Sequence, residues 1–153
     1  MRLSEEGAEA CIFCKIARHE VESHIVLEED DSIAFLDKRP VFPGHTLLVT
    51  KAHYETLADL PTDIIGPLFS TAQLLATAVV EATRSDGSFV AINNRVSQSV
   101  PHLHVHVVPR RRGDGLRGFF WPRQPYKTEE SALETQRAIR SAVERLRASK
   151  KLA

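Results

Sequence analysis

Residues 99–110 read Ser-Val-Pro-His-Leu-His-Val-His-Val-Val-Pro-Arg, and this stretch places three of the chain's seven histidines two residues apart. Successive side chains of a β-strand point to opposite faces of the sheet, so the spacing predicts a strand with all three imidazoles on one face. The histidines are His102, His104 and His106. The outer two would lie about 13 Å apart at about 3.3 Å per residue, too far for one zinc ion to bind all three.

The segments around this strand predict an α+β domain. Alternating and β-branched residues predict further strands, which cover residues 25–27, 32–37, 45–50 and 89–93. Apolar residues three and four apart predict one long helix over 62–83, and a C-terminal helix over 128–150 begins at a Thr128 cap. A short turn or helix is expected at 11–17. The sequence therefore predicts one sheet of five strands with two principal helices.

Composition is typical of a single globular domain. The chain has 153 residues, of which 42% are hydrophobic, and its 20 basic residues balance 20 acidic ones. A balanced charge gives no general attraction for nucleic acid, and the N-terminus lacks the apolar core of a signal peptide. We therefore expect one domain over residues 1–153 with a polar leader at 1–10, located in the cytoplasm, with neither a nucleic acid nor a membrane as partner.

Both cysteines lie in one motif, Cys11-Ile-Phe-Cys14. In a reducing compartment this spacing is typical of metal binding or redox work. Two thiolates need two further ligands for a tetrahedral zinc site, and His53 with one end of the triad could supply them. Such a closed site would be structural. Free thiols or a redox pair are the alternatives.

The middle histidine of the triad is a candidate nucleophile. A neutral imidazole attacks phosphorus well when its other nitrogen holds the proton in a fixed hydrogen bond, which His104 could achieve. His106 could then contact a phosphate oxygen or the leaving group, with Gln98 and Ser99 just upstream. The alternative is a His-x-His metal pair of a metal-dependent hydrolase or oxygenase.

The sequence His-Leu-His-Val-His-Val-Val at 102–108, following Gln-Ser-Val, resembles the signature of the histidine triad (HIT) superfamily of nucleotide hydrolases and transferases. The resemblance extends over most of the chain, through segments at 11–16, 34–37, 43–47, 51–53 and 109–110. Within the superfamily, residues 38–45 and 106–114 are more similar to the fragile-histidine-triad branch, whose members hydrolyse dinucleoside polyphosphates. The resemblance implies an α+β fold with a five-stranded antiparallel sheet, and a homodimer.

The resemblance also implies a role for particular residues. His104 would form a covalent nucleotidyl intermediate with the α-phosphate, His106 would contact that phosphate, and His45 would orient the cluster. The nucleotide would be bound by ribose, phosphate and purine contacts from Phe13, Ile16, Phe35, Leu36, Asp37, Asn93, Ser97, Gln98, Ser99 and Val100. In zinc-containing bacterial relatives, the residues matching Cys11, Cys14, His53 and His102 hold a structural zinc ion.

The expected activity is hydrolysis of a dinucleoside polyphosphate, such as diadenosine tetraphosphate or triphosphate, at an α-phosphate with release of AMP. Hydrolysis of a purine nucleoside phosphoramidate, or nucleotidyl transfer, is the alternative within the superfamily. A nucleotide-binding scaffold with incidental turnover is an alternative of another class. Five arginines between residues 110 and 123, beside the aromatic run 119–121, are hypothesised to meet a phosphate chain.

Overall fold

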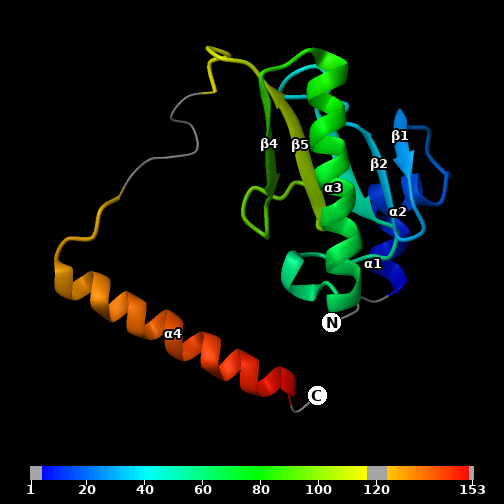
Figure 1. Ribbon diagram of the computed structural model, residues 1–153. Coiled ribbons are helices and arrows are strands. Elements are labelled where there is room, and N and C mark those ends of the chain that lie inside the picture. The colour runs from blue at the N-terminus through cyan, green and yellow to red at the C-terminus, as the bar shows by residue number, and fades with distance from the viewer. Residues whose placement is uncertain (1–4, 117–123, 152–153) are drawn as a thin grey trace. The chain divides into compact units, whose positions relative to one another are not determined.

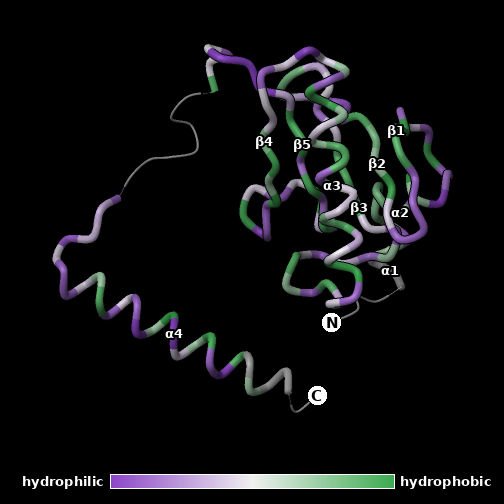
Figure 2. The backbone as a smooth tube through the Cα atoms, in the orientation of Figure 1, coloured by the Kyte–Doolittle hydropathy of each residue, from purple (hydrophilic) through white to green (hydrophobic). Residues whose placement is uncertain are grey.

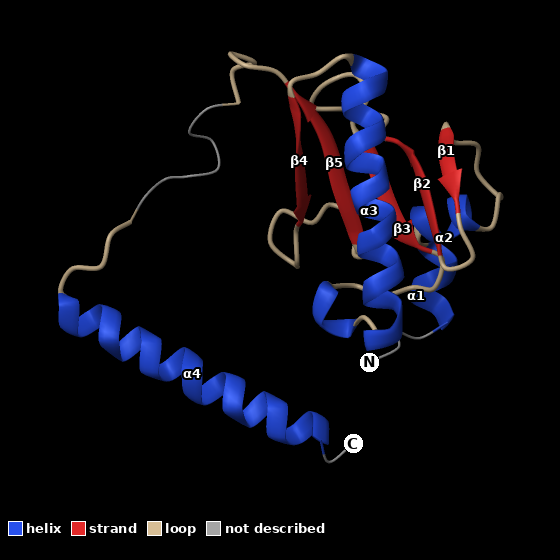
Figure 3. Cartoon of the chain, viewed as in Figure 1, coloured by secondary structure: helices blue, strands red, loops and turns tan. Residues whose placement is uncertain are grey.

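The computed structural model describes residues 5–116 and 124–151. The chain divides into two compact units, Met1–Asp114 and Gly115–Ala153. The first contains a five-stranded antiparallel sheet with helices on both of its faces (Figure 1, Figure 3). The predicted α+β class with a five-stranded antiparallel sheet is therefore confirmed. That residues 1–153 form one domain stays a prediction.

The strands follow the order β1-β2-β3-β5-β4, and all neighbours are antiparallel. Their bounds are β1 Ile25–Glu28, β2 Ser32–Leu36, β3 Thr46–Thr50, β4 Gly87–Ile92 and β5 His104–Arg110. At the centre of the sheet, Val49 of β3 lies opposite His104 of β5, and Leu47 lies opposite His106. The two histidines of β5 thus stand on an interior strand: β3 pairs with both of them, and β4 also pairs with His106.

The two faces of the sheet carry separate cores. Helix α3 (Thr62–Thr83) covers one face, where its buried residues pack with alternate residues of the central strands, such as Leu48, Val105 and Val107. Helix α2 (Ile12–Ala17) contributes to the other core, together with Phe35, Leu47 and Val49. Because side chains alternate along a strand, the histidines of β5 lie on the α2 side.

Helix α3 has the predicted bounds and accommodates Pro67 in its second turn. The carbonyl group of Pro67 accepts a hydrogen bond from the Thr71 hydroxyl at 3.1 Å. By length and composition α3 is apolar enough to cross a membrane, and Figure 2 shows its mixed hydropathy. Its buried side chains, Leu68 and Leu75 among them, pack on the sheet as those of a core helix do.

Two expectations about local structure are wrong. Strand β5 begins at His104, so His102 lies in the bend that precedes the strand. Pro101 has no N–H for a sheet ladder, and the N–H of Leu103 is taken by the carbonyl of Tyr54 at 2.6 Å. The leader also contains a short helix, α1 (Glu5–Ala10), where only a polar segment was expected.

The second unit contains helix α4 (Glu129–Lys151). Thr128 caps it as predicted: its hydroxyl accepts the N–H of Ser131 at 3.1 Å, and the Ser131 hydroxyl accepts the N–H of Thr128 at 3.2 Å. Every residue predicted for catalysis, substrate binding or metal binding lies in the first unit. The short 3₁₀ helix η1 (Leu57–Asp59) completes the elements of that unit.

Candidate functional site

A pocket of about 600 Å³ lies over the α2 side of the sheet and is bordered by two of the triad histidines. Ten of the residues predicted for substrate binding or catalysis line it, namely Phe13, Ile16, Phe35, Leu36, Asp37, His45, Ser99, Val100, His104 and His106. The sequence analysis missed six further lining residues: Ile12, Ser23, Lys38, Arg39, Val41 and Leu47. The pocket therefore combines an apolar part with a cluster of imidazoles.

Asn93, Ser97 and Gln98 do not line this pocket. The Gln98 side chain instead holds the preceding loop together, because it donates to the Glu55 carbonyl at 2.6 Å and accepts the Arg95 N–H at 2.7 Å. The role of Asn93, Ser97 and Gln98 in phosphate binding stays a prediction.

His104 is held in one tautomer by its own backbone neighbour. Its Nδ1 lies 2.6 Å from the carbonyl oxygen of His102, which can only accept, so Nδ1 carries the proton. The lone pair is then on Nε2, for which the described residues provide no hydrogen bond. The ring is 3% exposed and packs edge-on against Phe13 with centroids 5.2 Å apart. This arrangement suits a nucleophilic imidazole.

His45 and His106 form a relay whose direction is fixed by a backbone amide. The N–H of Val41 donates to Nδ1 of His45 at 3.1 Å, so the proton of a neutral His45 is on Nε2. That Nε2 lies 3.0 Å from Nδ1 of His106 and donates to it. His106 then carries its proton on Nε2, a buried atom with no hydrogen-bond partner among the described residues. His106 lines the pocket and carries one N–H that no described residue accepts.

Burial keeps both rings of this relay neutral. Desolvation, with His104 and His45 nearby, lowers the pKa of His106 to about 4 against the opposing effect of Asp37. Burial likewise lowers the pKa of His45, although Asp37 acts in the opposite direction. A neutral His106 retains the single N–H that the relay assigns to it at neutral pH.

Asp37 stands at the end of β2 beside these rings. Its Oδ1 accepts the N–H of Arg39 at 2.8 Å, and its own N–H donates to the His45 carbonyl at 2.9 Å. Its Oδ2 lies 3.7 Å from Nδ1 of His45, too far for a hydrogen bond to a nitrogen that already accepts from Val41. Oδ2 thus remains able to accept from a ligand hydroxyl. One ligand atom each of Asp37, His45 and His106 lies within 4.8 Å of the others.

A second cluster lies next to the pocket and joins four possible metal ligands from three segments. Cys11 and Cys14 come from the start of α2, His53 follows β3, and His102 precedes β5. Their ligand atoms all lie within 4.8 Å of one another. Nδ1 of His53 is 3.1 Å from Sγ of Cys14, and Nδ1 of His102 is 3.4 Å from Sγ of Cys11 and 3.5 Å from that of Cys14.

These distances fit a tetrahedral zinc ion. With Zn–S of about 2.3 Å and Zn–N of about 2.0 Å, sulfur and nitrogen ligands are about 3.5 Å apart. Nε2 of His102 donates to the Thr50 carbonyl at 2.8 Å, which leaves the lone pair of Nδ1 facing the sulfurs. Without a cation, burial and the neighbouring Cys11 raise the pKa of the Cys14 thiol to about 12, and burial lowers that of His102 to about 4. A bound Zn²⁺ would favour the thiolate, and two sulfurs with two imidazoles form a set that zinc prefers.

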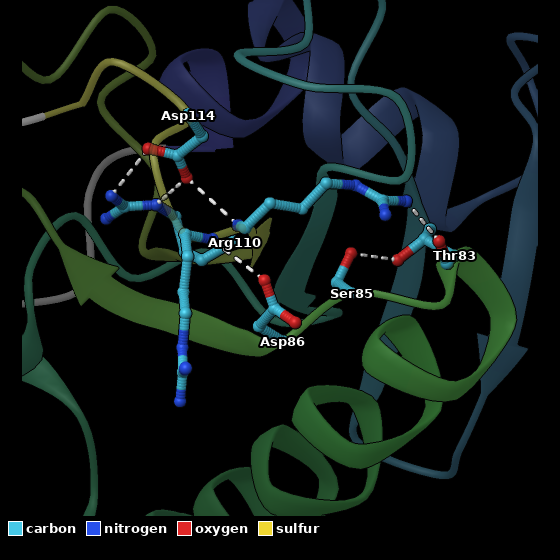
Figure 4. A network of polar contacts seen from close by, with 7 residues as sticks. Thr83, Ser85, Asp86, Arg110 and Asp114 are labelled. Carbon is cyan, nitrogen blue, oxygen red and sulfur yellow. Dashed lines mark hydrogen bonds and ion pairs between the residues drawn. The ribbon is translucent and has the colours of Figure 1, made fainter.

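Two arginines at the end of β5, Arg110 and Arg111, form hydrogen bonds within the protein (Figure 4). The guanidinium of Arg110 makes two hydrogen bonds to the carboxylate of Asp114, at 2.5 and 2.9 Å. Arg111 donates to the carbonyls of Thr83 and Arg84 at the end of α3. Arg110 is thus held by the turn that follows β5, and Arg111 by the end of α3. Neither side chain lines the pocket that contains His104. Arg112 is exposed, and its backbone N–H donates to Asp86 at 2.8 Å. Residues 117–123 of the predicted phosphate-binding segment lie outside the described residues.

The chain is similar to several known proteins. Residues 18–113 match the family model of the HIT domain. The chain is 36% identical over 108 residues to Adenylylsulfatase HINT3 of Arabidopsis thaliana, covering 69% of this chain and 55% of the plant protein. It is 37% identical over 119 residues to Adenosine 5'-monophosphoramidase HNT1 of Saccharomyces cerevisiae, covering 75% of this chain and 72% of the yeast protein. Among solved structures, a Zn-bound histidine triad family protein from Mycobacterium smegmatis is 33% identical, covers 93% of this chain and 99% of its own, and has a TM-score of 0.67.

Proposed function

The chain belongs to the HIT domain family, and on this premise we propose that it is a nucleotide hydrolase in which His104 is the nucleophile. The observation that carries the proposal is the 2.6 Å contact between Nδ1 of His104 and the His102 carbonyl, which directs the Nε2 lone pair away from the backbone. The pocket beside it has an apolar part for a base, the Asp37 carboxylate for a ribose and a ring N–H of His106 for a phosphate.

The reaction has two displacements at one phosphorus. Nε2 of His104 attacks the α-phosphorus, an N–P bond forms, and the bond from phosphorus to the leaving group breaks. The Nε2–H of His106 donates to a phosphoryl oxygen, and the His102 carbonyl stabilises the imidazolium that forms. Water then attacks the same phosphorus and loses a proton to the solvent, the N–P bond breaks with its electron pair returning to Nε2, and AMP leaves with His104 in its neutral tautomer.

We assign zinc to Cys11, Cys14, His53 and His102 as a structural ion. Bound there, Zn²⁺ would supply folding energy and would tie the N-terminal segment to the sheet. Four protein ligands would leave no open position for substrate. The donor set and its distances support this assignment, as does the likeness to the zinc-bound mycobacterial structure.

For the substrate we propose a dinucleoside polyphosphate, as in the fragile-histidine-triad branch. The plant and yeast relatives carry the names adenylylsulfatase and adenosine 5'-monophosphoramidase, so an adenylyl group joined to sulfate or to an amine is the second candidate. All of these compounds share an adenylyl phosphorus and differ in the leaving group. The nucleophile proposed for this chain is the same for each.

The test is product analysis with trapping of the intermediate. We expect the zinc-loaded protein to convert diadenosine tetraphosphate into AMP and ATP, and acid-sensitive, base-stable nucleotide to be recovered on the wild-type chain after a rapid alkaline quench. A His104→Ala variant should carry none. Tight AMP binding with no turnover of polyphosphates, adenylyl sulfate or phosphoramidates would contradict a hydrolase and favour a nucleotide-binding scaffold.

We also propose that the protein acts as a homodimer in the cytoplasm, without a nucleic acid or a membrane as partner. β4 is an edge strand, and Val90 on it is 42% exposed, as is Phe69 on the outer side of α3. A second copy that paired β4 with β4 would continue the sheet and satisfy the strand edge. Analytical ultracentrifugation tests the dimer, and a monomer at micromolar concentration would contradict it.

A further inference from the structure

Two cationic side chains on the rim of the pocket have no part in the chemistry described so far. Lys38 and Arg39 both line the pocket, and both are exposed. Neither side chain forms an ion pair with any residue that the structure describes. The adjacent Asp37 carboxylate accepts the backbone N–H of Arg39 and forms no ion pair with the guanidinium. Two uncompensated positive charges therefore border the site.

The loop that carries these cations forms the wall next to the imidazole relay. Asp37 and His45 begin and end the loop and are joined by a backbone hydrogen bond of 2.9 Å. Between them, Val41 both lines the pocket and donates to His45. Lys38 and Arg39 thus lie on the same wall as the groups proposed to bind ribose and phosphate.

The direction of the reaction places the leaving group near this rim. In a displacement at phosphorus, the leaving group departs on the side opposite the nucleophile. His104 lines the pocket and is only 3% exposed, so a substrate attacked by its Nε2 directs its leaving group away from the sheet and towards the open side of the pocket. Lys38 and Arg39 are the exposed lysine and arginine among the residues that line the pocket.

We propose that Lys38 and Arg39 form a subsite for an anionic leaving group and select adenylyl compounds that leave as a phosphate chain or another oxyanion over those that leave as an amine. The inference rests on the proposed function and deepens it. Negative charge develops on the leaving oxygen as the P–O bond breaks, and fixed cations stabilise it. An amine must instead gain a proton as the P–N bond breaks, and neighbouring cations disfavour that positive charge.

The experiment compares kcat/KM for diadenosine tetraphosphate with kcat/KM for adenosine 5′-phosphoramidate, whose leaving group is ammonia. The double variant Lys38→Gln, Arg39→Gln should lower the ratio of the two constants by about tenfold, with Arg39→Lys retaining most of the preference. The ratio in the wild type should also fall as salt is added, and less so in the double variant. Arg84→Gln, which removes an exposed charge at the end of α3 and outside the pocket, is the matched control and should leave the ratio unchanged.

The outcomes separate the two proposals. If the wild type hydrolyses both compounds and the double variant keeps the ratio within twofold, or loses both activities equally, the leaving-group subsite is wrong while the hydrolase stands. If the wild type hydrolyses neither compound and also fails to cleave adenylyl sulfate, the proposed function is wrong and the subsite falls with it.

Discussion

Nδ1 of His104 lies 2.6 Å from the carbonyl oxygen of His102, so a residue of the four-membered Cys and His cluster sets the tautomer of the proposed nucleophile. His102 is in turn fixed by a 2.8 Å hydrogen bond from its Nε2 to the Thr50 carbonyl. His102 therefore joins the candidate metal cluster to the proposed nucleophile on the α2 side of the sheet.

Replacing His104 by Ala should abolish turnover, by a factor of at least about 10³, because the covalent intermediate loses its attacking atom. The chain should still fold and bind zinc because none of the four metal ligands is changed, although the variant loses the hydrogen bond from Nδ1 to the His102 carbonyl. Steady-state hydrolysis of diadenosine tetraphosphate measures the first effect, and circular dichroism with zinc analysis measures the second. A His104→Ala protein with a tenth of the wild-type rate would refute nucleophilic catalysis at this position.

Cys14→Ser should reduce bound zinc from about one ion per chain to a small fraction and should lower the free energy of unfolding by at least about 3 kcal/mol. The reason is that Sγ of Cys14 contacts both imidazoles of the cluster. Elemental analysis by mass spectrometry and urea unfolding check the two effects. His19→Gln, at an exposed histidine outside the cluster, is the control. Equal zinc in Cys14→Ser and wild type would rule out the site.

His106 should make stability depend on pH. Its pKa is about 4 in the folded chain against an ordinary 6.5, so between these values the unfolded chain binds more protons than the folded one. Its contribution is complete above about pH 6.5 and is lost as pH falls towards 4. Wild type should therefore lose about 1 kcal/mol more than His106→Asn between pH 7.5 and pH 5, after allowance for its partial exposure. Urea unfolding of both proteins at both pH values measures the difference, and parallel losses would contradict it.

Gly44→Ala should destabilise the protein by about 2 kcal/mol or more. Gly44 has φ of +97°, and a Cβ there would stand 2.6 Å from Cγ2 of Thr83 at the end of α3. Gly87→Ala at the start of β4 is the matched control: its φ is not positive and nothing lies within 4 Å of the added Cβ, so it should change stability by less than about 1 kcal/mol. Thermal unfolding should therefore shift down for Gly44→Ala and little for Gly87→Ala, and a shift of Gly44→Ala upwards would exclude the steric argument.

The fold was predictable because its signals are local. The two-residue alternation of β5 and the three-and-four spacing of α3 each depend on one continuous segment, and the bounds of α3 agree with the prediction. That His102 lies outside the strand was not predictable. The two-residue spacing of the histidines includes His102, but Pro101 and the hydrogen bond of Leu103 with Tyr54 confine the β-ladder to the residues that follow it.

The site was only partly predictable for a related reason. The residues alone pointed to the two cysteines, to His53 and to one end of the triad, and left open which end, because these ligands are distant in sequence. The family resemblance selected His102. The rim cations Lys38 and Arg39 were missed because the path of the loop after Asp37 decides whether they border the pocket. The signal available was two adjacent cations immediately before the turn at residues 40–44.

The alternation along β5 has a consequence for how this chain can change. His104 and His106 face one core, and Val105 and Val107 face the other. Deleting or inserting one residue within this strand would move imidazoles into the layer beneath α3 and valines into the pocket. The number of residues in β5 is thus under tighter constraint than the identity of the side chains on its valine face, where another aliphatic residue would still fit. Insertions and deletions are tolerated only in the loops that flank the strand.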